Sequence, residues 1–155
     1  MDKNTSKVQL ILEAVFNGAI DKLTKQDNGQ LVSALLVQLD FTTGEALVFD
    51  DKEILLEKNI IYEWVDQPEK SGRFYRQALH YMRVVLAALR LAKVFDNPVF
   101  LRPFKVMVVD DIFNEIETVF VLEAVEGLPE GRLMKNLDQE LHIFYKKIFE
   151  KYLEI

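Results

Sequence analysis

Residues 71–95 include no acidic side chain, although the whole chain of 155 residues carries a net charge of −6. On a helix, which advances near 100° per residue, the arginines and the histidine of this segment fall on one narrow stripe. We call these residues the basic stripe: Arg73, Arg76, His80, Arg83 and Arg90. Apolar side chains fill the broad opposite side, which predicts a central helix covered by other elements. The stripe needs an acidic surface or an anionic ligand to face, so we take its members as candidate binding residues.

Length and composition predict one globular domain, residues 1–155. The absence of cysteine excludes disulfides, thiolate metal sites and a cysteine nucleophile. The first residues lack the basic and apolar regions of a signal peptide, and no apolar run is long enough to cross a bilayer. We therefore expect a cytoplasmic protein with no membrane partner. Its net negative charge also argues against nucleic-acid binding.

The hydrophobic pattern changes period several times along the chain. Helical spacing is found in residues 6–25, 71–95 and 132–153, and Ser6 with Gln9 has the pattern of a capping box at the first start. Strand-like runs are residues 31–41, 45–49, 104–109 and 116–125, with residues 99–102 also expected to be extended. Residues 52–64 could form a strand or a short helix capped by Asp51. We favour the strand, because β-branched and aromatic residues dominate the second half of this segment.

This order, α-ββ(β)-α-ββ-α, predicts an α+β domain with a mostly antiparallel sheet of four or five strands and three helices. The strands of the second hairpin, residues 104–109 and 116–125, are apolar on both faces. A strand of that kind is normally covered on both faces. We therefore predict either helices on both sides of the sheet or a dimer that covers one side.

Residues 106–131 have the opposite charge pattern, because they include seven acidic residues and no lysine or arginine. Opposite segregation of charge in one chain predicts a contact between the central helix and the second hairpin, within a chain or between subunits. Residues 105–111, ending in Asp110 and Asp111, resemble the first strand and acidic pair of response-regulator receiver domains. The repeated βα units of that family do not follow them, so we interpret the pair as an exposed hairpin turn.

No catalytic motif is present. The serines have no nucleophile motif, the glycines form no phosphate-binding loop, and the two histidines lie alone, without metal-ligand spacing. We therefore expect no metal and no cofactor, and favour a protein that is not an enzyme. The aromatic residues Tyr62, Trp64 and Phe100 are further candidate binding residues, which would form a partner-binding patch if they are exposed.

The order of elements, the size and the pI of about 5.0 resemble the small dimeric chaperones of bacterial type III secretion. The same order is also similar to roadblock-type scaffold domains. No sequence motif carries either resemblance, so neither implies a role for a particular residue. We expect a small acidic protein that acts through protein–protein contact as a homodimeric chaperone-like or adaptor domain. The alternative is a binding module for a small anionic ligand or nucleotide, held by Arg73, Arg76, His80 and Arg83.

Overall fold

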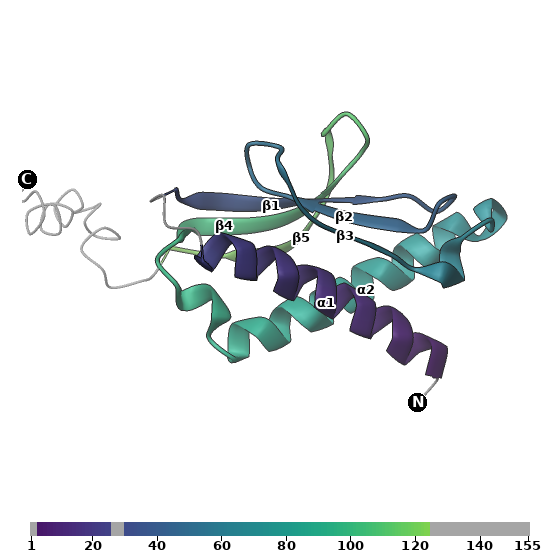
Figure 1. Ribbon diagram of the computed structural model, residues 1–155, viewed down its shortest axis with the longest axis horizontal. Coiled ribbons are helices and arrows are strands. Elements are labelled where there is room, and N and C mark those ends of the chain that lie inside the picture. The colour runs from purple at the N-terminus through teal and green to yellow at the C-terminus, as the bar shows by residue number, and fades with distance from the viewer. Residues whose placement is uncertain (1–2, 26–29, 125–155) are drawn as a thin grey trace, which may run out of the picture. The chain divides into compact units, whose positions relative to one another are not determined.

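The computed structural model describes residues 3–25 and 30–124 of the chain (Figure 1). Its helices are α1 (Lys3–Lys25) and α2 (Ser71–Leu91), with short 3-10 helices η1 (Tyr62–Trp64), η2 (Pro68–Lys70) and η3 (Val94–Asp96). Its strands are β1 (Val32–Leu39), β2 (Glu45–Phe49), β3 (Leu55–Ile60), β4 (Phe100–Val109) and β5 (Glu115–Leu122). The predicted helix 132–153 lies outside the described residues.

The chain divides into two compact units, Met1–Val121 and Leu122–Ile155. Every contact described below lies within the first unit. Whether the chain acts as the single domain predicted from its length stays a prediction.

The strands form one five-stranded sheet in the order β3-β2-β1-β4-β5. The pairs β1–β2 and β2–β3 are antiparallel, as predicted, but β1 and β4 are parallel, with Leu36 opposite Met107. The prediction of a mostly antiparallel sheet is therefore wrong in its centre, and the sheet is mixed. The reason is the connection through α2, because a long helical crossover can return the chain to a parallel neighbour whereas a tight turn cannot.

Both helices pack on the same face of the sheet, as Figure 1 shows. The main core lies between these layers. It includes Phe16 of α1, Met82 and Leu86 of α2, and Leu35 of β1, each fully buried. Among the described residues, neither α-helix covers the opposite face, so the prediction that helices on both sides or a dimer cover the sheet stays a prediction.

The opposite face of the sheet has a smaller apolar cluster. Ala34, Leu36 and Val109 are buried there, and Phe49, Met107 and Phe113 pack partly buried against them. The ring of Phe113, from the turn after β4, meets the ring of Phe49 edge-on at 5.0 Å between centroids. This cluster explains why β4 carries apolar residues, Met107 and Val109, on its second face.

Several predicted boundaries need correction. Helix α1 begins at Lys3, so Ser6 lies inside the helix and is not its cap. The segment 52–64 does contain strand β3, but its aromatic second half is the 3-10 helix η1. Helix α2 ends at Leu91 instead of Phe95, because Lys93 takes a left-handed conformation with φ 65° that stops the helix.

Strand β4 starts earlier than predicted and contains a proline. Its register against β1 shifts between the pairs Val32–Phe100 and Ala34–Lys105, so that the stretch around Pro103 bulges out of the ladder. A proline has no N–H to donate and is tolerated in a sheet at such an irregularity. The bulge brings Arg102 close to η3, where its guanidinium pairs with Asp96 at 3.6 Å.

Two turns of the sheet, β2–β3 and β4–β5, share one hydrogen-bonding pattern. In the first, Oδ1 of Asp50 accepts from the backbone N–H of Lys52 at 2.8 Å and of Ile54 at 3.0 Å. In the second, Oδ1 of Asp110 accepts from the backbone N–H of Ile112 at 3.0 Å and of Asn114 at 2.8 Å. The fourth residue of each turn is left-handed, namely Glu53 with φ 65° and Phe113 with φ 66°. The interpretation of Asp110 and Asp111 as a hairpin turn is confirmed.

Candidate functional site

The basic stripe lies on the surface of α2. Arg73, Arg76, His80, Arg83 and Arg90 are all exposed, because the apolar positions of the helix face the sheet and α1. The guanidinium of Arg83 pairs with the carboxylate of Glu117 on β5 at 3.0 Å. The predicted contact between the basic helix and the acidic hairpin therefore forms within one chain at this pair. Both side chains are half exposed, so the pair stabilises the fold only weakly.

Tyr75 lies close to this ion pair. Its hydroxyl is buried and has no hydrogen-bond partner among the described residues. Burial is the main cause that raises the pKa of Tyr75, the charge of Glu117 raises it further, and the charge of Arg83 opposes both. Tyr75 also lines a cavity of about 390 Å³ at the carboxyl ends of β1 and β4, whose rim includes Asp40, Glu45 and Asp111. Among the described residues, no group of acidic and histidine side chains is arranged to hold a metal ion.

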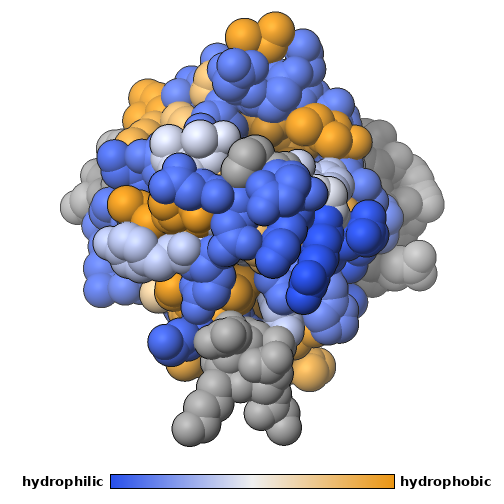
Figure 2. Space-filling view, turned by 90° about the vertical axis from the view of Figure 1, so that its right-hand side faces the viewer, coloured by the Kyte–Doolittle hydropathy of each residue, from blue (hydrophilic) through white to orange (hydrophobic). Residues whose placement is uncertain are grey.

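Figure 2 views the side of the molecule from which α2 begins, and there hydrophobic side chains appear as separate areas among hydrophilic ones. Arg90 lines a cavity at the far end of α2. The lining of that cavity includes neither Arg83 nor Arg73, Arg76 and His80. The four-residue anion clamp predicted from the sequence is thus divided, since Arg83 is already paired with Glu117.

The predicted aromatic patch is divided as well. Trp64 is fully buried, and its ring lies 4.7 Å from that of Phe41 between centroids. Phe100 is buried against Phe95 and Phe104. Tyr62 alone of the three is exposed, at 74%. Trp64 and Phe100 therefore serve the core, because η1 and the start of β4 turn their large rings inward.

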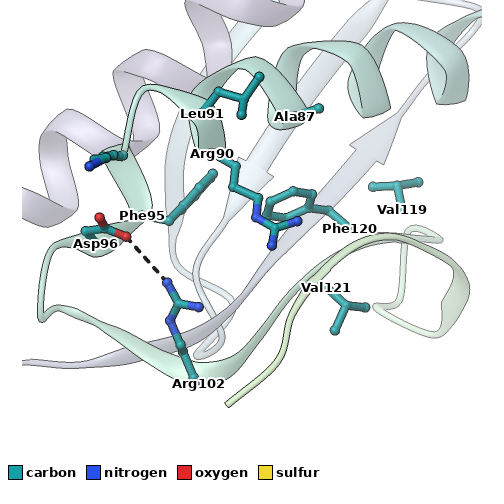
Figure 3. A pocket seen from close by; sticks show the side chains of 10 residues that line it. Ala87, Arg90, Leu91, Phe95, Asp96, Arg102, Val119, Phe120 and Val121 are labelled. Carbon is teal, nitrogen blue, oxygen red and sulfur yellow. Dashed lines mark ion pairs between the residues drawn. The ribbon is translucent and has the colours of Figure 1, made fainter. Parts of the chain in front are cut away.

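A larger cavity than the one beside Tyr75 lies at the other end of α2. It has a volume of about 810 Å³ and is bounded by α2, η3, β4 and β5 (Figure 3). Its apolar wall includes Leu91, Phe95, Phe120 and Val121, and its charged side chains are Arg90, Lys93, Asp96 and Arg102. We call it the basic cavity, because it holds three cations and one carboxylate.

The three cations come from α2, from the residue before η3 and from β4. Figure 3 shows Arg90 reaching from α2 and Arg102 reaching from β4 toward the same space, with Phe120 beside it. Arg102 is paired with Asp96, whereas Arg90 and Lys93 have no carboxylate within ion-pair distance among the described residues. Like charges that converge beside an apolar wall repel one another, and an anion between them relieves the repulsion. The cavity therefore suits a ligand or a pair of side chains in which an anionic group lies next to an apolar group.

Sequence reasoning identified one member of this cavity and missed the others. Arg90 belongs to the basic stripe, but Arg102 and Phe120 had no distinguishing pattern. Arg102 joins the lining of this cavity because β4 returns parallel to β1 after the crossover, and that pairing was not predicted. The cavity therefore had no signal in the sequence beyond the charge of α2.

Neither α-helix of the described part is long and apolar enough to cross a membrane. No protein-family model matches this chain, and neither a curated protein nor a solved structure matches it at a significant level. Its function must be inferred from the geometry of its own residues.

Proposed function

We propose that the protein acts without catalysis, through protein–protein contact, as a homodimeric chaperone-like or adaptor protein. The single observation that carries this proposal is an exposed apolar surface beside the basic cavity. Leu91 at the end of α2 is 84% exposed, and Val84 on the same helix and Val121 on β5 are 39% and 38% exposed. We call Val84, Leu91 and Val121 the α2–β5 surface.

The spacing of these residues supports a role as one surface. Val84, Ala87 and Leu91 lie three, four and seven positions apart, which places them on one side of a helix. Ala87, Leu91 and Val121 also line the same cavity. Single exposed apolar side chains are ordinary, but a group of them around a cavity is typical of an interaction site.

The proposal is tested by the mass of the protein in solution, measured by light scattering over a range of concentrations. Leu91→Asp should shift the protein to the monomer, because it places a carboxylate in the contact. Leu10→Asp is the matched control, since Leu10 is 62% exposed on α1 and lies beside Tyr62, away from the basic cavity. A wild-type protein that is monomeric throughout, or a Leu91→Asp variant with wild-type mass, would contradict the proposal.

A small anionic ligand is the second candidate function. The observation in its favour is that Arg90, Lys93 and Arg102 all line one cavity, with Arg90 and Arg102 directed toward the same space (Figure 3). It predicts that inorganic phosphate or citrate raises the melting temperature at constant ionic strength, and that Arg90→Gln removes this effect while the mass stays unchanged. Equal melting temperatures with and without these anions would exclude this function for both probes.

A further inference from the structure

The β4–β5 turn carries two side chains that its own geometry does not need. The turn is formed by Asp110, whose carboxylate binds the backbone of Ile112 and Asn114. The β2–β3 turn has the same bonds around Asp50, with Lys52 at the position of Ile112. Because a lysine serves equally well at that position, the conformation of the turn does not explain an isoleucine there. Ile112 is nevertheless 70% exposed.

The second acidic residue also differs between the two turns. In the β2–β3 turn, Oδ2 of Asp51 accepts hydrogen bonds from the backbone N–H and the hydroxyl of Ser33, at 2.9 and 3.1 Å. Asp111, at the same position of the β4–β5 turn, is exposed and has no such partner among the described residues. The β4–β5 turn therefore presents a carboxylate and an aliphatic side chain next to each other.

The basic cavity has the complementary chemistry. Arg90 and Lys93 offer positive charge without a carboxylate partner in the described residues, and Leu91, Phe120 and Val121 offer an apolar wall beside them. An occupant that carries one carboxylate and one aliphatic side chain satisfies both parts. Asp111 and Ile112 are such an occupant, and the turn stands at the start of β5 while the cavity lies toward the end of that strand.

We propose that the basic cavity of each chain receives Asp111 and Ile112 from the β4–β5 turn of a second copy. This inference rests on the proposed function, and it names the residues that the partner copy contributes. A two-fold axis near the middle of β5 exchanges the two ends of the strand. It therefore brings each turn to the cavity of the other chain, and the two equivalent contacts close a dimer.

Charge reversal tests the pairing directly. Arg90→Glu and Asp111→Lys should each raise the dimer Kd by roughly tenfold or more, because each places like charges opposite one another in both contacts. An equimolar mixture of the two variants should recover dimers, and only mixed ones. In a mixed dimer, one contact pairs Glu with Lys and the other pairs the original Arg90 with the original Asp111. Native mass spectrometry resolves mixed from identical pairs.

Ile112→Ser tests the apolar half of the contact, with Lys52→Ser as the matched control in the equivalent turn. Both substitutions keep the aspartate that forms the turn, and circular dichroism checks that both variants fold. Ile112→Ser should weaken the dimer, and Lys52→Ser should not.

The outcomes separate this inference from the proposed function. If Leu91→Asp breaks the dimer but both charge reversals leave it intact, the turn is not the occupant and the proposed function stands. If the wild-type protein is monomeric at every concentration tested, both this inference and the proposed function are overturned. A mass that keeps growing beyond the dimer with concentration would overturn the closed two-fold arrangement, since a head-to-tail contact that does not close builds filaments.

Discussion

At the scale of single residues, Asp50 is the clearest local determinant of the fold. It is the buried charged residue of the described core, at 8% exposure, and its Oδ1 accepts two backbone N–H groups of the β2–β3 turn. We predict that Asp50→Ala lowers the free energy of unfolding by about 1–3 kcal/mol, because it leaves these donors without a partner. Urea denaturation measures the change. Asp50→Asn keeps an acceptor oxygen and should cost less; equal losses in both variants would contradict this explanation.

Asp110 predicts a pH dependence of stability. The backbone N–H of Asn114 is the largest cause that holds the pKa of Asp110 below its usual 3.8, the N–H of Ile112 adds to it, and partial burial opposes both. The folded carboxyl therefore binds a proton less readily than the unfolded one. Its contribution is fully present above about pH 4, the unfolded pKa range, and is lost as the pH falls through the folded pKa.

Asp110→Asn supplies the comparison, since an amide does not titrate in this range. The difference in unfolding free energy between wild type and Asp110→Asn should be constant from neutral pH down to about pH 4 and then shrink with further acid. Urea denaturation at a series of pH values measures it. A difference that grows in acid would contradict the assignment.

At the scale of elements, the sequence predicted best where side-chain periodicity and turn chemistry agree. Helix α2 and the hairpin β1–β2 follow from repeating apolar positions and a glycine-containing turn, and Gly44 indeed has φ 81°. Periodicity could not locate the end of α2, because the chain leaves the helix at a left-handed conformation of Lys93 that the apolar spacing does not indicate. Periodicity also could not predict the parallel pairing of β1 with β4, since strand order depends on long-range contacts.

The basic stripe shows the same limit for the site. Its exposure follows from helical spacing, and its charge complement in the second hairpin was visible in the sequence. The sequence could not show which arginine is already paired, because Arg83 and Glu117 are brought together by the order of strands in the sheet. Arg83→Glu would place two carboxylates side by side within one chain, so Arg90 is the better residue for testing contact between chains.

The Arg83–Glu117 pair itself should be weak. The two side chains are 48% and 40% exposed, so water and salt screen their attraction. We predict a coupling energy of about 0.2–1 kcal/mol, measured by a double-mutant cycle with Arg83→Met and Glu117→Gln. Near 1 M salt, where the Debye length is about 3 Å, the coupling should fall toward zero. A coupling that stays unchanged in high salt would mean that packing joins the two side chains.

At the scale of the whole molecule, net charge and local charge oppose each other in self-association. Each chain carries a net charge of −6, so two copies repel at long range. The proposed contacts bring opposite charges together at short range. Salt weakens both effects, and the sign of its net effect on the dimer tells which one dominates.

We predict that the dimer weakens when salt rises from about 0.01 M to about 1 M, over which the Debye length falls from about 30 Å to about 3 Å. The reason is that Asp111, Arg90 and Lys93 are exposed in the single chain, so salt screens the attraction that brings them together. Light scattering at fixed protein concentration measures the mass. A mass that rises with salt would mean that screening of the net repulsion dominates and that apolar side chains such as Leu91 hold the contact. Such a result would contradict the prediction that short-range charge pairing dominates the salt dependence, and the charge-reversal mixture then decides whether Asp111 meets the basic cavity.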